Sequence, residues 1–260
     1  MKHLFLIIFL SMMLDAQEEN KEIDVFTVSA SSRYSTAQIT HGVDVSGNQG
    51  IISNGISVGH ANGLSFSYVN TSLLTGTTLN HTFCAGYSYD FTDFFSGDIE
   101  FTHTRYPDQS INAVAEFPNA LAVSVSADLQ LFDLSLSYDK YFGTGAPAYI
   151  GIDAMKIVIV NDWAFIPIID LTFISQEINY TTAKFKPNST NSKKTGQVVQ
   201  SVVSLSGISG LSFGCIFRYD LGKGFSTRFV PQMSLTPKQE IAARSTQWTA
   251  SLGLSYTTGF

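Results

Sequence analysis

The sequence has little charge, little cysteine and no long hydrophobic run. Charged residues make up 14% of its 260 positions, against about 25% in ordinary soluble domains. Two cysteines, Cys84 and Cys215, are too few for a disulfide framework or a cysteine-based metal motif. Beyond the N-terminal segment, the most apolar stretch is 164–174, and Pro167 and Asp170 interrupt it. Since a membrane-spanning helix needs about 20 apolar residues, these absences disfavour both a helical membrane protein and a disulfide-stapled domain.

Positive charge is also in deficit. The chain has 15 Lys and Arg against 21 Asp and Glu, a formal net charge of −6. Proteins that bind nucleic acid neutralise phosphates with a basic surface, so the balance argues against nucleic acid as a partner. The sequence shows no cofactor motif and no metal-ligand spacing.

The N-terminus has the parts of a secretory signal peptide. Lys2 precedes an apolar run over 4–14, and the small residue Ala16 is followed by a polar stretch. The run is too short to span a membrane as a helix. We expect residues 1–16 to be removed and 17–260 to form the mature domain.

Aromatic residues are abundant, at 13% of the chain, and many lie in segments that alternate apolar and polar. Leu121, Val123 and Val125 alternate with Ser124 and Ser126, the period of a strand with one apolar and one polar face. We expect strands near 24–34, 51–60, 64–71, 79–90, 95–106, 119–128, 132–141, 149–160, 163–176, 209–220, 224–235 and 246–260. The sequence therefore predicts an all-β, antiparallel, transmembrane β-barrel of about twelve strands.

The expected connections alternate between short and long. Tight turns such as Ala61-Asn62-Gly63 alternate with longer polar links, as do the periplasmic turns and outer loops of bacterial barrels. The segment 198–207 has strand character but would make the strand number odd. We expect it to lie in the long outer loop, as a strand extension or a short helix.

The last segment, WTASLGLSYTTGF at 248–260, carries aromatics near both ends of its apolar face. A terminal Phe260 on such a strand resembles the C-terminal signature of bacterial outer-membrane barrels. That resemblance implies recognition of the strand by the barrel assembly machinery, outer-membrane lipid around the wall, and a Gram-negative source.

The outline also resembles a poorly characterised family of channel-type outer-membrane barrels. The resemblance lies in SSRY at 31–34, HGVD at 41–44, NGISVGHANGLSFSYVN at 54–70, and the ending from GFSTRFVPQMSL at 224–235 to Phe260. The family has an Arg-Gly pair where this chain has His41-Gly42. The resemblance implies a channel and supplies no catalytic residues.

A barrel lipid hydrolase is the third alternative. Outer-membrane phospholipases and lipid A deacylases pair a histidine with a serine two residues later. Here the mature histidines His41, His60, His81 and His103 are followed at that spacing by Val43, Asn62, Phe83 and Arg105. Since a base must lie within hydrogen-bonding distance of its nucleophile, the missing serines disfavour an enzyme.

Charged residues on the polar parity of the strands are the candidate functional residues. The candidate pore-lining residues are Asp98, Glu100, Asp139, Lys156, Asp170, Arg218 and Arg228. Acids gather on the middle strands and bases on later ones, an arrangement that tunes ion passage and orients dipolar solutes. The alternative is a network of ion pairs that closes the lumen. The sequence thus favours a passive, porin-like channel for small solutes, with a closed structural or binding barrel as the main rival.

Overall fold

The structure is a computed structural model, and it describes eleven stretches of the chain. These are residues 25–37, 39–40, 43–44, 46, 49–107, 117–143, 146–174, 181–184, 197–200, 207–235 and 246–259. The predicted signal peptide at 1–16, His41 and the terminal Phe260 lie outside them. The expected contact of Phe260 with the assembly machinery therefore stays a prediction.

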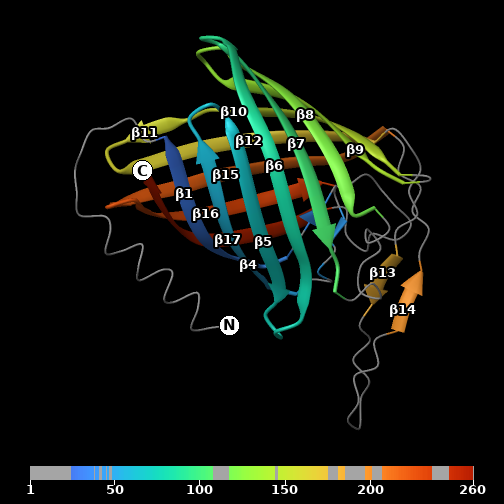
Figure 1. The fold of residues 1–260 in the computed structure, drawn as a ribbon. Coiled ribbons are helices and arrows are strands. Elements are labelled where there is room, and N and C mark those ends of the chain that lie inside the picture. The colour runs from blue at the N-terminus through green and yellow to red at the C-terminus, as the bar shows by residue number, and fades with distance from the viewer. Residues whose placement is uncertain are drawn as a thin grey trace.

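Every regular element in the described part of the chain is a β-strand (Figure 1). The strands are β1 (Phe26–Ser35), β2 (Ile39–Thr40), β3 (Val43–Asp44), β4 (Ile51–His60), β5 (Leu64–Leu73), β6 (Thr78–Thr92), β7 (Phe95–Arg105), β8 (Asn119–Asp128), β9 (Asp133–Tyr141), β10 (Ala148–Met155), β11 (Val158–Val160), β12 (Trp163–Ile174), β13 (Thr181–Lys184), β14 (Gln197–Gln200), β15 (Gly207–Gly222), β16 (Phe225–Leu235) and β17 (Thr246–Gly259). The structure describes no helix long and apolar enough to cross a membrane.

The large sheet closes on itself as a barrel. Each wall strand pairs antiparallel with its neighbours in chain order, and β1 pairs with β4 on one side and β17 on the other. Because β10 and β11 both pair with β12, they are two parts of one wall strand. The wall therefore has twelve strands, which confirms the predicted antiparallel barrel.

The wall strand predicted over 149–160 is interrupted. Residues 156 and 157 separate β10 from β11, beside Pro167 on the neighbouring strand β12. Proline has no amide hydrogen, so it removes one rung of a β-ladder and favours a local irregularity. The ladder is bridged there by a single hydrogen bond of 3.3 Å from the Lys156 amide to the Pro167 carbonyl.

The two ends of the barrel differ as the sequence predicts. At one end the strands are joined by tight turns, and Gly63 in the Asn-Gly turn has a φ of 96°, which favours glycine. At the other end the connections are longer, except that residues 74–77 form a short turn between β5 and β6. There β13 and β14 form a separate hairpin that is not part of the wall. Of the segment predicted at 198–207 to lie outside the wall, residues 198–200 do so as part of β14, residues 201–206 lie outside the described residues, and Gly207 begins the wall strand β15.

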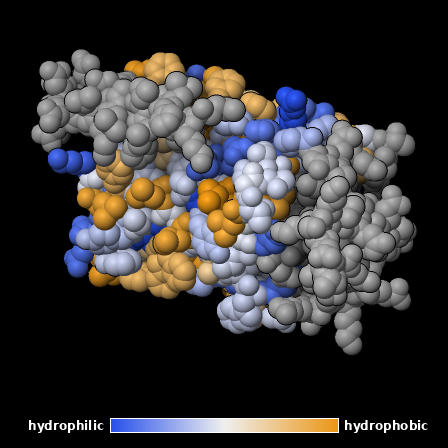
Figure 2. All heavy atoms as spheres, turned by 90° about the horizontal axis from the view of Figure 1, so that it is seen from below, coloured by the Kyte–Doolittle hydropathy of each residue, from blue (hydrophilic) through white to orange (hydrophobic). Residues whose placement is uncertain are grey.

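The outer face of the wall is rich in apolar side chains. Val123, Val125 and Leu252 are 41%, 46% and 59% exposed, and they belong to the parity that the alternation predicts to be apolar. On the side of the molecule drawn in Figure 2, orange apolar residues cover much of the wall, with paler and blue residues among them. The opposite parity holds mainly Ser, Thr, Gly and charged residues, and a cavity lies on this face. That polar face is therefore the inside of the barrel.

Candidate pore lining

Asp98 and Glu100 lie side by side along the inner face of β7. Asp98 accepts hydrogen bonds from the hydroxyls of Ser88 and Ser124, its partners on the two neighbouring strands. Glu100 accepts one from Thr102 at 3.1 Å. Both carboxylates remain exposed to solvent although they point into a closed barrel. Water therefore reaches the lumen at this level.

Three further carboxylates continue this acidic wall onto the next strands. Asp139 is on β9, and its charge interacts with that of Glu100. Asp153 on β10 and Asp170 on β12 are directly opposite each other in the register. Their carboxyl groups lie within hydrogen-bonding reach of one another. Like charges at this separation repel when both are ionised, so this part of the wall attracts cations.

A cavity of about 300 Å³ opens beside these carboxylates. Its lining residues are Ser137, Asp139, Gly151, Asp153, Asp170, Thr172, Gly210, Ser212, Gln232 and Ser234. Gly151 keeps the space open, because a Cβ there would lie 2.4 Å from the hydroxyl of Ser137. No group of three His, Cys, Asp or Glu suited to a metal ion occurs among the described residues. The hollow is a polar recess of the inner wall.

Three arginines form a basic wall on other strands. Arg218 on β15 is paired in register with Arg228 on β16, and Gly253 on β17 separates Arg228 from Arg33 on β1. The charges of Arg33 and Arg218 both act on Arg228. All three side chains are exposed to solvent. Within the described residues none of them has an ion-pair partner.

The acidic and basic walls face each other across the lumen. In the twelve-strand ring, β7 with Asp98 is six strands from β16 with Arg228, halfway around. In the same way β9 with Asp139 is six strands from β1 with Arg33. Fixed charges of opposite sign on opposite sides of a water-filled lumen set up a transverse field.

Lys156 is placed differently from the other six predicted residues. It lies in the break between β10 and β11, and its ammonium group donates a hydrogen bond to the carbonyl of Gln130. Gln130 belongs to the tight turn between β8 and β9. Lys156 therefore ties the strand break to a turn at the end of the barrel, apart from the arginines. The register to β12 is unbroken across the gap, since Met155 pairs with Ile168 and Val158 with Phe165. Lys156 therefore has the parity of the outward-facing Ile152, not that of the lumen.

Two lining residues were missed by the sequence reasoning. Asp153 lies three positions before Lys156 and so has the opposite parity, which means that choosing Lys156 as the inward residue left Asp153 out. Arg33 lies in a serine-rich strand whose alternation is weak, and only its register opposite Gly253 places it with the other arginines. The small residue at position 253, flanked by apolar Leu252 and Leu254, was the available signal for room on the inner face.

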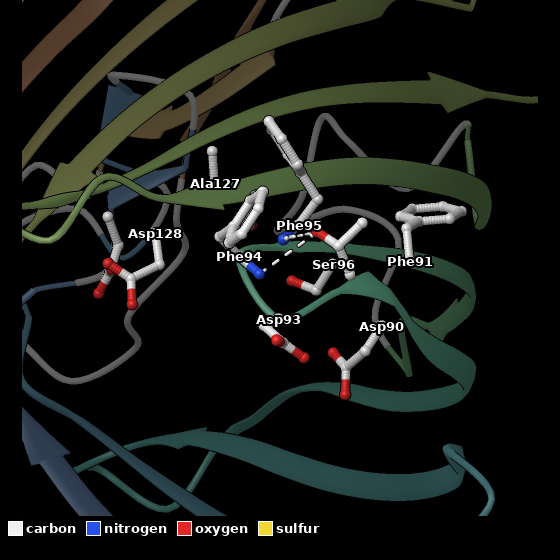
Figure 3. Close-up of a pocket in the computed structure, with 11 residues that line it drawn as sticks. Asp90, Phe91, Asp93, Phe94, Phe95, Ser96, Ala127 and Asp128 are labelled. Carbon is white, nitrogen blue, oxygen red and sulfur yellow. Dashed lines mark hydrogen bonds between the residues drawn. The ribbon is translucent and has the colours of Figure 1, made fainter.

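A second acidic recess lies at the tight-turn end of the barrel. It has a volume of about 520 Å³ and includes the β6–β7 turn and the ends of β8 and β9. Figure 3 shows Asp90 and Asp93 on one side of it, with the rings of Phe91, Phe94 and Phe95 nearby. Asp128 also lines the recess, and it accepts a hydrogen bond from the Gln130 amide at 2.7 Å, which makes it a turn residue as well.

None of the described histidines is hydrogen-bonded to a serine. His60 accepts a hydrogen bond from the Asn62 amide at 3.1 Å in the β4–β5 turn. His81 and His103 lie on the outer face, where their hydrogen-bond partners come from Tyr68 and Asn70 and from Asn119. These contacts provide no serine–histidine pair for an acyl-transfer reaction.

The two cysteines are free thiols. Cys84 is on the inner face, 3.6 Å from the Thr102 hydroxyl. Cys215 is on the outer parity of β15, opposite Pro167 of β12.

The fold is similar to the folds of solved outer-membrane channels. A KdgM porin has a TM-score of 0.54 at 13% identity, covering 88% of this chain and 98% of the porin. A NanC porin has a TM-score of 0.52 at 10% identity, with coverages of 88% and 98%. An outer-membrane channel from Pseudomonas putida F1 has a TM-score of 0.53 at 10% identity, with coverages of 93% and 98%. No protein-family model matches the chain, and no curated protein sequence matches it significantly.

At these identities the similarity concerns the fold. It agrees with two properties of the chain itself, the closed antiparallel wall of twelve strands and the apolar outer face. A closed barrel satisfies all of its backbone hydrogen bonds within the wall, which a lipid environment requires. The protein therefore has the fold of the channel-type β-barrels of Gram-negative bacteria and lies in the outer membrane.

Proposed function

We propose that the protein is a passive channel for small hydrophilic solutes. The observation that carries the proposal is the solvent exposure of charged side chains inside a closed barrel. Asp98, Glu100 and Arg228 are all exposed although they point inward from strands on opposite sides of the ring. Charged side chains with this solvent exposure indicate a hydrated lumen, because burying a charge without a partner costs several kcal/mol.

The missing ion pairs favour the channel over a lumen closed by a charge network. A network that plugged the barrel would join the acidic and basic walls, whereas the inward arginines have no ion-pair partner among the described residues. The acidic side chains bond instead to hydroxyls of their own wall, such as Ser124 for Asp98. A KdgM porin has been solved in complex with oligogalacturonate, so a barrel of this fold can hold a hydrophilic solute.

The rival functions need other observations. A closed structural or binding barrel would act through its outer loops, most of which lie outside the described residues. A lipid hydrolase would need a histidine beside a serine, whereas the described histidines contact Tyr, Asn and backbone groups. The proposed function involves no catalysis and no cofactor, and its partners are the solute and the surrounding lipid.

Single-channel recording of the refolded protein in a planar bilayer tests the proposal. We expect discrete conductance steps from the wild type. Ser251→Trp places a large ring on the inner face of β17, while Leu252→Trp places the same ring on the outer face one residue later. The first variant should conduct less than the second. A correctly folded wild type with no conductance would reject the channel, and equal conductance of the two variants would reject this assignment of the lumen wall.

A further inference from the structure

One side of the outer face carries a row of polar residues, although the outer face is otherwise mainly apolar. On β1, β4, β5, β6 and β7, one continuous cross-strand row is polar, and it consists of Ser32, Asn54, Asn70, His81 and Arg105. We call these five residues the outer polar row. They share the parity of the outward-facing Phe83 and Phe101, which are 47% and 43% exposed. The row therefore lies on the outer face.

The charge of the row increases toward the end of the barrel that carries the long connections. Ser32 lies three residues before the end of β1, whereas Arg105 is the last residue of β7. Because barrel strands tilt by about 35–45°, a row perpendicular to them climbs along the barrel axis. The uncharged members thus lie deeper in the membrane and Arg105 lies at its extracellular edge.

The deeper polar side chains of the row form hydrogen bonds with neighbouring side chains. The Ser32 hydroxyl donates to Asn54 Oδ1 at 2.9 Å. His81 Nδ1 lies 2.8 Å from the Tyr68 hydroxyl and 3.3 Å from the Asn70 amide nitrogen. With Nδ1 accepting these two bonds, a neutral His81 carries its proton on Nε2, which has no partner among the described residues.

The donors at the upper end of the row are the guanidinium of Arg105 and the Nε2–H of His81. His103 lies one step below Arg105 on the same face of β7, and its Nδ1 donates to Asn119 Oδ1 at 2.8 Å. His103 and Arg105 are both exposed, and within the described chain Arg105 makes no ion pair. A guanidinium with no ion-pair partner among the described residues, beside the Nε2–H of His81 on the paired strand, is a site for phosphate, since charge-assisted bonds to phosphate are strong.

We propose that the upper end of the row, His81 and Arg105, together with the adjacent His103, binds the phosphorylated sugar headgroup of the glycolipid in the outer leaflet. Two observations favour lipid over a second copy of the chain. The positive charge lies where anionic headgroups lie, and below it the polar side chains are already paired within the wall. The lipid headgroup thus contacts the charged end of the row. The acyl chains contact the deeper polar side chains, whose hydrogen bonds are already made within the wall.

The test measures lipid A bound to the refolded protein by native mass spectrometry in detergent. We expect doubly phosphorylated lipid A to bind the wild type, and the same lipid A without its phosphates to bind at least about tenfold more weakly, since bonds to charged groups are worth over 1.4 kcal/mol. The triple variant His81→Gln/His103→Gln/Arg105→Gln should bind doubly phosphorylated lipid A more weakly by the same factor. Lys140→Gln is the matched control, because Lys140 is also on the outer parity but donates to the Ala146 carbonyl at 3.1 Å.

Four outcomes decide the proposal. Equal binding to the wild type and the triple variant would overturn it, as would equal binding of the two forms of lipid A. A dimer that the triple variant dissociates would assign the row to a protein interface instead. If the triple variant fails to form a heat-modifiable barrel, Arg105→Gln is measured alone and is expected to lower the binding. Unchanged binding by that variant would overturn the proposal.

Discussion

The inner and outer faces of the same strands obey different rules, and β8 shows the difference at neighbouring positions. Val123 is 41% exposed on the outer face, while the hydroxyl of Ser124 bonds to Asp98 inside. On the outer face the deeper polar groups of the row are paired, as Ser32 is with Asn54, and the unpaired Arg105 lies at the membrane edge. The inner face tolerates unpaired charge, because water reaches it. Side-chain identity at each position follows from which solvent the face meets.

The largest test of this comparison places one arginine on each face of β8. Val123→Arg should destabilise the folded barrel by about 2–4 kcal/mol if the site lies near the bilayer midplane. Ser124→Arg should cost little, because its guanidinium enters water beside Asp98. The measurement is denaturant unfolding in lipid vesicles. Similar losses for the two variants would contradict the assignment of the faces.

A smaller effect separates two serines on β1. The Ser32 hydroxyl bonds to Asn54 on the outer face, and the Ser29 hydroxyl lies 2.9 Å from that of Thr257 on the inner face. Ser32→Ala should cost about 1–2 kcal/mol, because lipid offers no replacement donor for Asn54. Ser29→Ala should cost less, because water replaces the lost group.

The double variant Ser32→Ala/Asn54→Leu sharpens this comparison. Removing both partners leaves no unsatisfied group, so unfolding in vesicles should show part of the lost stability restored. Additive losses for the two changes would mean that the outer polar row is not a bonded unit in the membrane.

The smallest energies concern the opposed charges of the lumen. Neutralising Arg218 and Arg228 to Gln should shift selectivity toward cations, and neutralising Asp98 and Glu100 to Asn and Gln should shift it toward anions. Each charge contributes about 1 kcal/mol or less in water. The shifts should be clearest in dilute salt, where the Debye length is about 30 Å at 0.01 M.

Reversal potentials across a salt gradient measure these shifts. Ser251→Ala is an uncharged control on the inner face of β17. If the protein conducts but both charge variants shift the reversal potential in the same direction, the channel function stands. These residues would then not line the narrow part of the pore.

Much of the wall was predictable from local pattern. The alternation around Val123 and Ser124, the Asn-Gly turn at Gly63, and the even strand number all follow from side-chain period and connection length. The failures lie where the pattern is ambiguous or weak. Lys156 and Asp153 are charged residues of opposite parity three positions apart, so the charge pattern alone could not decide which of them faces the lumen. Arg33 lies among serines, whose small side chains give little contrast between faces.

The sequence by itself determined that the chain forms an antiparallel barrel, because strand period, aromatic content and turn chemistry act over a few residues. It also determined which side chains of most strands share a face. Only the tertiary structure decided which charges meet. The pairing of Arg218, Arg228 and Arg33 on one wall, with Asp98 half a ring away, depends on closure between β1 and β17. Closure joins residues more than two hundred positions apart, a distance over which no local pattern carries information.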